Sequence, residues 1–282
     1  METTLLRVDA LLPPEMARKA EQVGVKKAHM ATGPMFALAV LAGAFIALGA
    51  VFATTVAAGS EGWPWGVVRL LVGVSFSLGL ILVVVGGAEL FTGNNLIVMA
   101  WAGRKISTAR LLRNWAVVYA GNFVGALGTA ILTVLARQYT FGGGNVGRVA
   151  LAIATVKVQL DFGQALALGV LCNALVCLAV WLTFSARSTV DKIAAILFPI
   201  SAFVAAGFEH SVANMYFIPV ALLIKAWDPA FVAAAGVSAE ALTWRAFVMH
   251  NLLPVTLGNI VGGSVLVAGF YWAIFLRRTP RD

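Results

Sequence analysis

The chain alternates between long apolar stretches and short polar connections. Six stretches are apolar over more than about 20 residues, the length that a helix needs to cross a bilayer. They cover residues 35–57, 68–102, 115–135, 162–184, 193–227 and 251–276. Apolar residues make up 61% of the chain and charged residues 11%, and the mean hydropathy is +0.92. We therefore predict an all-α membrane protein with six transmembrane elements.

The second and fifth stretches are too long for one crossing and too short for two. Near the middle, each contains Gly-x-Glu followed five residues later by Asn, at 87–94 and again at 207–214. We expect two broken helices whose non-helical centres lie at membrane depth. Irregular backbone is tolerated there only where it is buried in protein or lines a water-filled path. The two breaks are therefore the candidate functional site.

The two halves of the chain share a second spacing. Asn114 begins the frame Asn-x6-Gly-Asn-x2-Gly in the third element, and Asn251 begins the same frame in the sixth. We therefore expect residues 35–135 and 162–276 to be two repeats within a single membrane domain, 1–282. Because three crossings separate equivalent elements, the repeats would be inverted relative to each other, as in many channels and transporters.

Small residues in these elements are interpreted as packing residues. The glycines expected to allow close helix approach are Gly121, Gly125, Gly258, Gly262 and Gly263. Cys172 and Cys177 lie five residues apart in one apolar stretch, on different faces of a helix. We expect both cysteines to be reduced and buried.

Lysine and arginine residues are distributed unevenly between the predicted connections. If the N-terminus is cytoplasmic, 14 of the 20 lysine and arginine residues lie in cytoplasmic segments. The other six lie outside or at the outer edge, and they are Arg69, Arg137, Arg148, Lys157, Lys225 and Arg245. The positive-inside rule then predicts that both termini are cytoplasmic.

The first 30 residues lack the apolar core and small-residue cleavage site of a signal peptide. Pro13 and Pro14 are followed by Met16, Ala20 and Val23 at helical spacing among charged residues. This pattern predicts an amphipathic helix on the cytoplasmic membrane surface, with a solvated tail as the alternative.

Only two acidic residues, Glu89 and Glu209, lie well inside the apolar stretches, at matching positions in the two breaks. They could bind a cation or proton in the path, or accept hydrogen bonds from loop N–H groups and hold the breaks in shape. The paired placement favours the structural role. His210 follows Glu209 directly, so its side chain points elsewhere and is expected to line the path. Lys157, taken alone, resembles an ordinary interfacial lysine.

Other classes of protein have less support. The net charge of +8 is not arranged as a basic patch interleaved with aromatic residues, so no nucleic-acid partner is expected. No His-Glu-x-x-His or serine-protease motif occurs, so we expect no catalytic residue, metal site or cofactor. An aquaporin-type channel for neutral solutes is the alternative from another class. It should carry Asn-Pro-Ala in both loops, and the sequence lacks that tripeptide.

Three motifs resemble the signatures of the formate/nitrite transporter family. They are Ala-Glu-Leu-Phe-Thr-Gly-Asn at 88–94, Gly-Phe-Glu-His-Ser-Val-Ala-Asn-Met-Tyr-Phe-Ile-Pro at 207–219 and Asn-Leu-Leu-Pro-Val-Thr-Leu-Gly-Asn-Ile-Val-Gly-Gly at 251–263. The resemblance extends from about residue 12 to about residue 276. It implies an aquaporin-like protomer in the bacterial cytoplasmic membrane, assembled as a homopentamer, with a pore for small monovalent anions in each protomer.

The resemblance also assigns residues to the path. The polar path residues that it implies are Thr92, Lys157, Asn173, His210 and Asn259. The constriction residues that it implies are Leu80, Leu90, Val176 and His210 towards the inside, Phe76 and Phe203 towards the outside, and Phe91. In this picture Lys157 concentrates anions, while Thr92 and Asn259 offer neutral hydrogen bonds in place of water.

The transported anion stays open among formate, nitrite and hydrosulfide, which are all small and singly charged. The similarity of the second and fifth elements to formate channels favours formate. His210 could lend a proton, so that the anion passes the apolar constriction as the neutral acid. Alternatively, it could be a fixed positive charge on a continuous anion path.

Overall fold

The computed structural model describes residues 11–277, and every regular element in that range is helical. The elements are α1 (Pro13–His29), α2 (Thr32–Ala57), α3 (Trp65–Gly86), η1 (Gly93–Ile97), α4 (Val98–Ala102), α5 (Thr108–Leu135), η2 (Gln138–Thr140), α6 (Asn145–Val158), α7 (Phe162–Thr183), α8 (Thr189–Ala206), α9 (Ser211–Trp227), α10 (Pro229–Ala234), α11 (Trp244–Ala246), η3 (Phe247–Leu252), α12 (Leu253–Ile260), η4 (Val261–Gly269) and α13 (Phe270–Phe275). The beginning of the predicted N-terminal segment and the last five residues lie outside the described residues.

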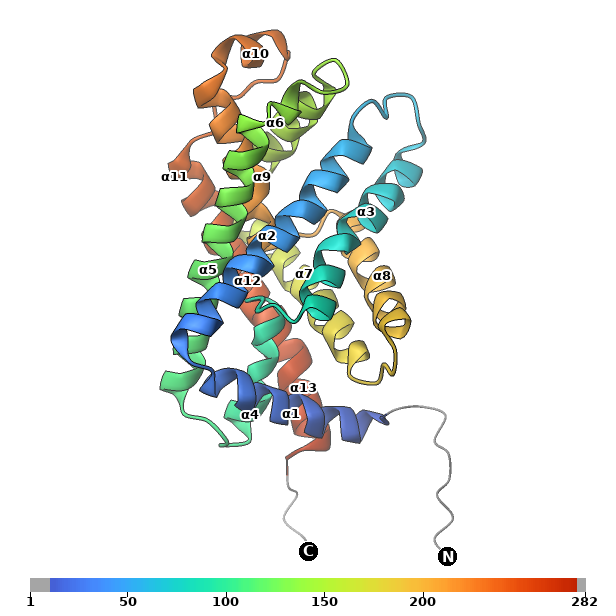
Figure 1. The fold of residues 1–282 in the computed structure, drawn as a ribbon, viewed down its shortest axis with the longest axis vertical. Helices are drawn as coiled ribbons and strands as arrows, with labels where there is room; N and C mark the ends of the chain where they lie inside the picture. The colour runs from blue at the N-terminus through green and yellow to red at the C-terminus, as the bar shows by residue number, and fades with distance from the viewer. Residues whose placement is uncertain (1–10, 278–282) are drawn as a thin grey trace, which may run out of the picture.

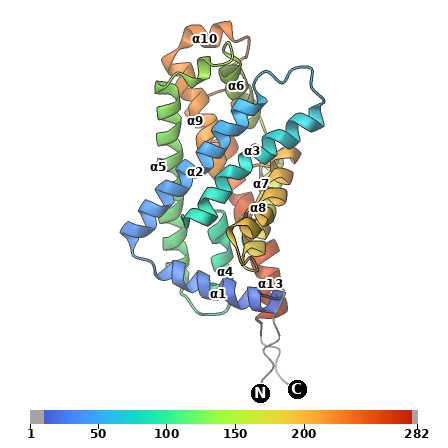
Figure 2. The same cartoon turned by 45° about the vertical axis from the view of Figure 1, so that its right-hand side comes forward.

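Within residues 11–277, six helical segments are long and apolar enough to cross a membrane: α2, α3, α5, α7, α8 and the composite segment Trp244–Phe275. This confirms the prediction of an all-α protein with six transmembrane elements. Figure 1 shows α1 lying across one end of the molecule beside α4 and α13, with α6 and α10 at the opposite end. The view in Figure 2 shows the same arrangement.

Both predicted breaks are present. α3 stops before Gly87 and α8 stops before Gly207, and these glycines have φ angles of 74° and 78°. Glycine adopts such left-handed conformations without the steric cost of a Cβ atom, so it ends a helix well. The chain becomes helical again at Gly93 after the first break and at Ser211 after the second.

Two helices begin before the apolar stretches that predicted them. The Ser107 hydroxyl accepts a hydrogen bond from the Arg110 N–H at the start of α5, and the Ser188 hydroxyl accepts one from the Asp191 N–H at the start of α8. These caps satisfy N–H groups of the first helical turn. Because capping residues are polar, the apolar stretches begin several residues after the true starts of both helices.

Glycines allow the helices of each half to pack backbone against backbone. A Cβ atom at Gly125 of α5 would lie 1.9 Å from the Val40 carbonyl oxygen of α2. A Cβ atom at Gly258 of α12 would lie 2.2 Å from the Leu166 carbonyl oxygen of α7. Such distances are far inside van der Waals contact, so these positions have the close-packing role that the sequence predicted.

The predicted N-terminal helix is present as α1, but its apolar face covers protein. Met16, Ala17, Ala20, Gly24 and Ala28 are buried. The helix packs against η1, α4, α5 and α13. It therefore closes one end of the bundle, instead of presenting its apolar face to lipid as the sequence suggested.

Candidate functional site at the helix breaks

Two cavities lie beside the breaks. The first, which we call the α1 cavity, has a volume of about 240 Å³ and is lined by α1, α3, the first break, η1 and α7. The second, which we call the α6 cavity, has a volume of about 410 Å³ and is lined by α2, α3, α6, α8, the second break and α9. The helices α1 and α6 lie at opposite ends of the molecule (Figure 1), and the two cavities that they line share no lining residue.

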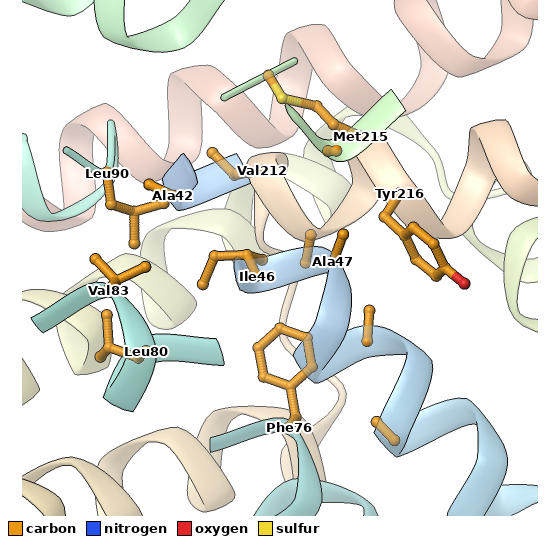
Figure 3. Close-up of a cluster of buried hydrophobic side chains, with 14 of the residues drawn as sticks. Ala42, Ile46, Ala47, Phe76, Leu80, Val83, Leu90, Val212, Met215 and Tyr216 are labelled. Carbon is orange, nitrogen blue, oxygen red and sulfur yellow. The ribbon is translucent and has the colours of Figure 1, made fainter. Parts of the chain in front are cut away.

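Apolar side chains line both cavities. Leu80 and Leu90 line the α1 cavity and are 2% and 3% exposed, and Figure 3 shows them grouped with Val83. Phe76 and Phe203 line the α6 cavity, with their ring centroids 5.7 Å apart in an edge-to-face contact. The structure thus brings the leucines to the α1 cavity and the phenylalanines to the α6 cavity.

Two further residues that the resemblance implies as constriction residues, Phe91 and Val176, are buried in the same core cluster as the leucines and phenylalanines. The Phe91 ring packs edge-to-face against Trp115 and Tyr119, with centroid distances of 6.0 and 4.8 Å. Val176 is buried in the core with 1% exposure. Neither residue lines the α1 or the α6 cavity.

Glu89 forms an ion pair in the first half of the protein. Its Oε1 atom accepts a hydrogen bond from Lys27 Nζ at 2.9 Å, and its Oε2 atom accepts one from Asn94 Nδ2 at 2.8 Å. Lys27 Nζ also donates to Asn94 Oδ1 at 2.9 Å. Asn94 Nδ2 in turn donates to Asn114 Oδ1 at 3.0 Å. The first break is thereby tied to α1 and α5.

The second half repeats this arrangement around Glu209. Its Oε1 atom accepts a hydrogen bond from Lys157 Nζ at 2.6 Å, and its Oε2 atom accepts hydrogen bonds from Asn214 and Asn251 at 2.7 and 3.1 Å. Asn214 Nδ2 also donates to Asn251 Oδ1 at 2.7 Å. The donors that the structure shows to both carboxylates are side chains, whereas we had expected loop N–H groups. Lys157 is a partly buried ion-pair partner, with 15% of its side chain exposed.

Lys27 is one of the 14 lysine and arginine residues that the sequence predicts on the cytoplasmic side, and no role in a break was expected of it. In the structure, Lys27 and Lys157 each lie five residues before the first residue of the next membrane helix, Thr32 or Phe162. The predicted apolar stretches, which begin at residues 35 and 162, did not show this correspondence. The observed ion pairs extend the likeness of the two halves to α1 and α6.

Asn122 and Asn259 brace the two breaks in the same way. Asn122 Nδ2 donates to the carbonyl oxygens of Ala39 and Glu89, and its Oδ1 atom accepts from the Phe91 N–H. Asn259 Nδ2 donates to the carbonyl oxygens of Gly169 and Glu209, and its Oδ1 atom accepts from the Ser211 N–H. All these donor–acceptor distances lie between 2.8 and 2.9 Å. An anion that bonded to Asn259 would therefore have to replace a carbonyl group.

Asn173 also connects the two halves. Its Nδ2 atom donates to the Asn259 carbonyl oxygen at 2.6 Å and to the Thr92 carbonyl oxygen at 3.3 Å. The side chain is fully buried and lines neither cavity. In the structure Asn173 is a link between backbones rather than a group that faces open space.

His210 and Thr92 join the two breaks to each other. His210 Nδ1 accepts a hydrogen bond from the Ala213 N–H at 3.0 Å, which caps α9, and Nε2 lies 2.9 Å from Thr92 Oγ1. A backbone N–H always donates, so in the neutral ring the proton is on Nε2, which donates to Thr92. His210 lines the α6 cavity, and Thr92 is fully buried behind it.

Arg69 is a second cation of the α6 cavity, and its role was not foreseen. Its Nε atom donates to the Ala205 carbonyl oxygen at 3.0 Å, and its Nη2 atom donates to the Val204 carbonyl oxygen, both in the last turn of α8. The charged side chains that line the α6 cavity are Arg69, Lys157 and Glu209, so its formal charge is +1. Lys27 and Glu89 line the α1 cavity, so its formal charge is zero. Among the residues described, no group of three or more His, Cys, Asp or Glu side chains is arranged to hold a metal ion.

The sequence and the fold both match characterised proteins. The Formate/nitrite transporter family profile matches residues 14–273. The formate channel FocA of Escherichia coli (strain K12) is 45% identical over 95% of this chain and 96% of its own length. A probable formate transporter of Methanothermobacter thermautotrophicus is 39% identical over 94% and 97%. A solved pentameric formate channel with formate bound superposes with a TM-score of 0.80 at 44% identity, over 87% of this chain and 98% of that one. With two broken helices, a matching fold and similarity along almost its whole length, this chain is a member of the formate/nitrite transporter family.

Proposed function

We propose that this protein conducts small monovalent anions across a membrane, with formate as its main substrate. The observation that carries the proposal is the α6 cavity, which has a formal charge of +1 and is lined by His210, whose Nε2 atom lies 2.9 Å from Thr92 Oγ1. A positive vestibule raises the local concentration of anions. The formate channels among the relatives support formate over nitrite and hydrosulfide.

Proton coupling through His210 is the second part of the proposal. Moving a bare carboxylate into an apolar constriction costs several kcal/mol even after relaxation. Protonating a small carboxylic acid with a pKa near 3.5 to 4 at pH 7 costs about 4 to 5 kcal/mol, which is comparable. Passage as the neutral acid is therefore feasible, with Thr92 available as a neutral hydrogen-bonding group.

The geometry sets a condition for this relay. To lend a proton and recover it, the ring must pass through a form that carries hydrogen on both nitrogen atoms. Hydrogen on Nδ1 would face the Ala213 N–H, so the bond that caps α9 would have to open. The same condition applies to the rival mechanism, in which His210 is a fixed positive charge.

We further propose a homopentamer in a bacterial cytoplasmic membrane, with both termini cytoplasmic and one path in each protomer. The solved pentameric relative supports this assembly. Exposed apolar side chains on the outer helices also need lipid or neighbouring subunits, for example Leu132 at 67% and Phe198 at 76% exposure. Native mass spectrometry in mild detergent tests the assembly, and a dominant monomer or tetramer would contradict it.

Anion flux into proteoliposomes tests the function. We expect saturable formate uptake that nitrite and hydrosulfide reduce by competition. A stronger affinity for either competitor would reassign the main substrate within the family. Glycerol or water flux without formate uptake would support an aquaporin-type channel for neutral solutes instead.

A further inference from the structure

A third cavity, of about 770 Å³, opens where α4 is followed by α5, near the end of α1. We call it the α4–α5 cavity. It shares no lining residue with the α1 or α6 cavity. Figures 1 and 2 place α4 and the start of α5 at the end of the molecule that α1 crosses. The cavity is therefore separate from the proposed path.

The wall of the α4–α5 cavity is basic. Arg104, Lys105 and Arg110 contribute three permanent cations, and His29 is a fourth basic group. No carboxylate lines the cavity. An open cavity with this lining is complementary to a group of at least one negative charge.

These three cations are also free, in contrast to others at the same end of the molecule. Within residues 11–277, no hydrogen bond or ion pair engages the side-chain nitrogen atoms of Arg104, Lys105 or Arg110, and all three residues are exposed. Arg113 donates instead to Thr32 Oγ1 at 2.6 Å, and Lys27 pairs with Glu89. The cations of the α4–α5 cavity thus have donors available for a ligand.

The cavity also lies at a boundary between polar and apolar surface. Trp101 is 43% exposed, and its Nε1 atom donates to Thr108 Oγ1 at 3.0 Å. Leu112, one helical turn after Thr108 on α5, is 54% exposed. Tryptophan with one apolar and one hydrogen-bonded edge is typical of the membrane–water interface. A molecule that filled this cavity could therefore place a charged group on the arginines and an apolar tail beside Leu112.

We propose that the α4–α5 cavity binds the phosphate headgroup of an anionic phospholipid from the leaflet on the α1 side. The Arg104 and Arg110 guanidinium groups suit phosphate because they can donate two parallel hydrogen bonds each. Lys105 adds a point charge, and the N-terminus of the 28-residue helix α5 adds its dipole. Basic pockets between transmembrane helices on the cytoplasmic side bind acidic headgroups in this way.

Native mass spectrometry of the full-length protein with phosphatidylglycerol or zwitterionic phosphatidylcholine tests the proposal. The wild type should retain phosphatidylglycerol in preference to phosphatidylcholine. The triple variant R104Q/K105Q/R110Q should lose up to about 100-fold in phosphatidylglycerol affinity, since each lysine or arginine near a bilayer contributes about fivefold. Size-exclusion elution and thermal unfolding, compared with the wild type, show whether the variant is folded.

A matched control removes the same charge from the same end of the protein. R18Q/K192Q/R277Q changes three cations that lie outside the α4–α5 cavity, and it should retain the lipid preference. Equal retention of the two lipids by the wild type would overturn the proposal. Equal loss in the control and the test variant would also overturn it, because only the total charge would then matter.

A second readout distinguishes a lipid from free phosphate. Phosphatidylglycerol with brominated acyl chains should quench less tryptophan fluorescence in Trp101→Phe than in the wild type, because Trp101 would lie beside the bound lipid. Glycerol phosphate, which carries the headgroup charge without acyl chains, should displace the lipid only at much higher concentration. If glycerol phosphate binds as tightly as the lipid, the lipid assignment is wrong.

Discussion

The charge balance of the α6 cavity leads to a specific prediction about Arg69. In the structure Glu209 compensates Lys157, so Arg69 provides the net charge that faces an arriving anion. Arg69→Gln should therefore reduce formate uptake at low ionic strength. Arg69→Lys is the matched control, because it retains the charge and can still reach a carbonyl oxygen at the end of α8.

The size of the α6 cavity determines how much the Arg69 charge should change formate uptake. A sphere of 410 Å³ is about 9 Å across. At about 8 Å, a unit charge changes the energy of an anion by about 0.5 kcal/mol in water and about 1 kcal/mol at an effective dielectric constant of about 40. Initial uptake at subsaturating formate should therefore fall about two- to sixfold in Arg69→Gln. The difference should shrink above about 0.1 M salt, where the Debye length is about 10 Å.

Stopped-flow measurement of formate uptake into proteoliposomes, at low and high salt, provides the assay. A second control is the double variant K157Q/E209Q, which removes the ion pair without changing the net charge of the cavity. If Arg69 attracts the anion, K157Q/E209Q should still take up formate faster than Arg69→Gln at low salt, and the difference should shrink at high salt. If Arg69→Gln takes up formate as fast as the wild type at low salt, the reasoning is refuted. It is also refuted if the salt dependence is lost in K157Q/E209Q but not in Arg69→Gln. Lys157 would then be the residue that attracts the anion.

Three further predictions concern the breaks and the packing. Lys27→Ala should lower the free energy of unfolding by about 2 kcal/mol because it leaves the Glu89 carboxylate without its charged partner, and adding Glu89→Gln should recover part of the loss in denaturation assays. Gly125→Ala should lower the unfolding temperature, since overpacking costs about 1 to 3 kcal/mol or more. In Gly128→Ala, on the same helix, the added methyl group meets no atom within 4 Å, so the unfolding temperature should stay equal or rise. Equal effects of the two substitutions would contradict the close packing at Gly125. His210→Asn keeps a side chain that can cap α9 but cannot relay a proton, so formate uptake and internal acidification should fall together, and undiminished proton-coupled uptake would exclude the relay.

The sequence was informative where a local pattern determines the structure. The positions of Gly87 and Gly207 in overlong apolar stretches predicted both breaks, because a left-handed helix end requires little more than the glycine itself. Helix starts were less predictable, since caps such as Ser107 and Ser188 are polar and lie outside the apolar stretches. The π-helical segments η3 and η4 within the sixth element have no counterpart in the apolar pattern.

Side-chain partners depend on tertiary contacts and were largely beyond prediction. Glu89 and Lys27 are 62 residues apart in the sequence, and Arg69 is 136 residues from its carbonyl acceptor Ala205. The intramembrane location of the glutamates indicated that they need partners, but apolar patterning does not say which cation reaches them. For the same reason the sequence predicted Lys157 only as an interfacial lysine or as a free cation that attracts anions. Its ion pair with Glu209 forms only when α6 packs against α9.

We propose that a path for small monovalent anions runs between the two breaks of each protomer. Initial formate uptake into proteoliposomes, measured beside protein-free liposomes and with glycerol permeability recorded in the same preparation, tests this most directly. We predict saturable formate uptake that depends on the protein, competition by nitrite and hydrosulfide, and no protein-dependent change in glycerol permeability. Formate uptake no faster than in protein-free liposomes, from a preparation shown to be folded and inserted, would contradict the account.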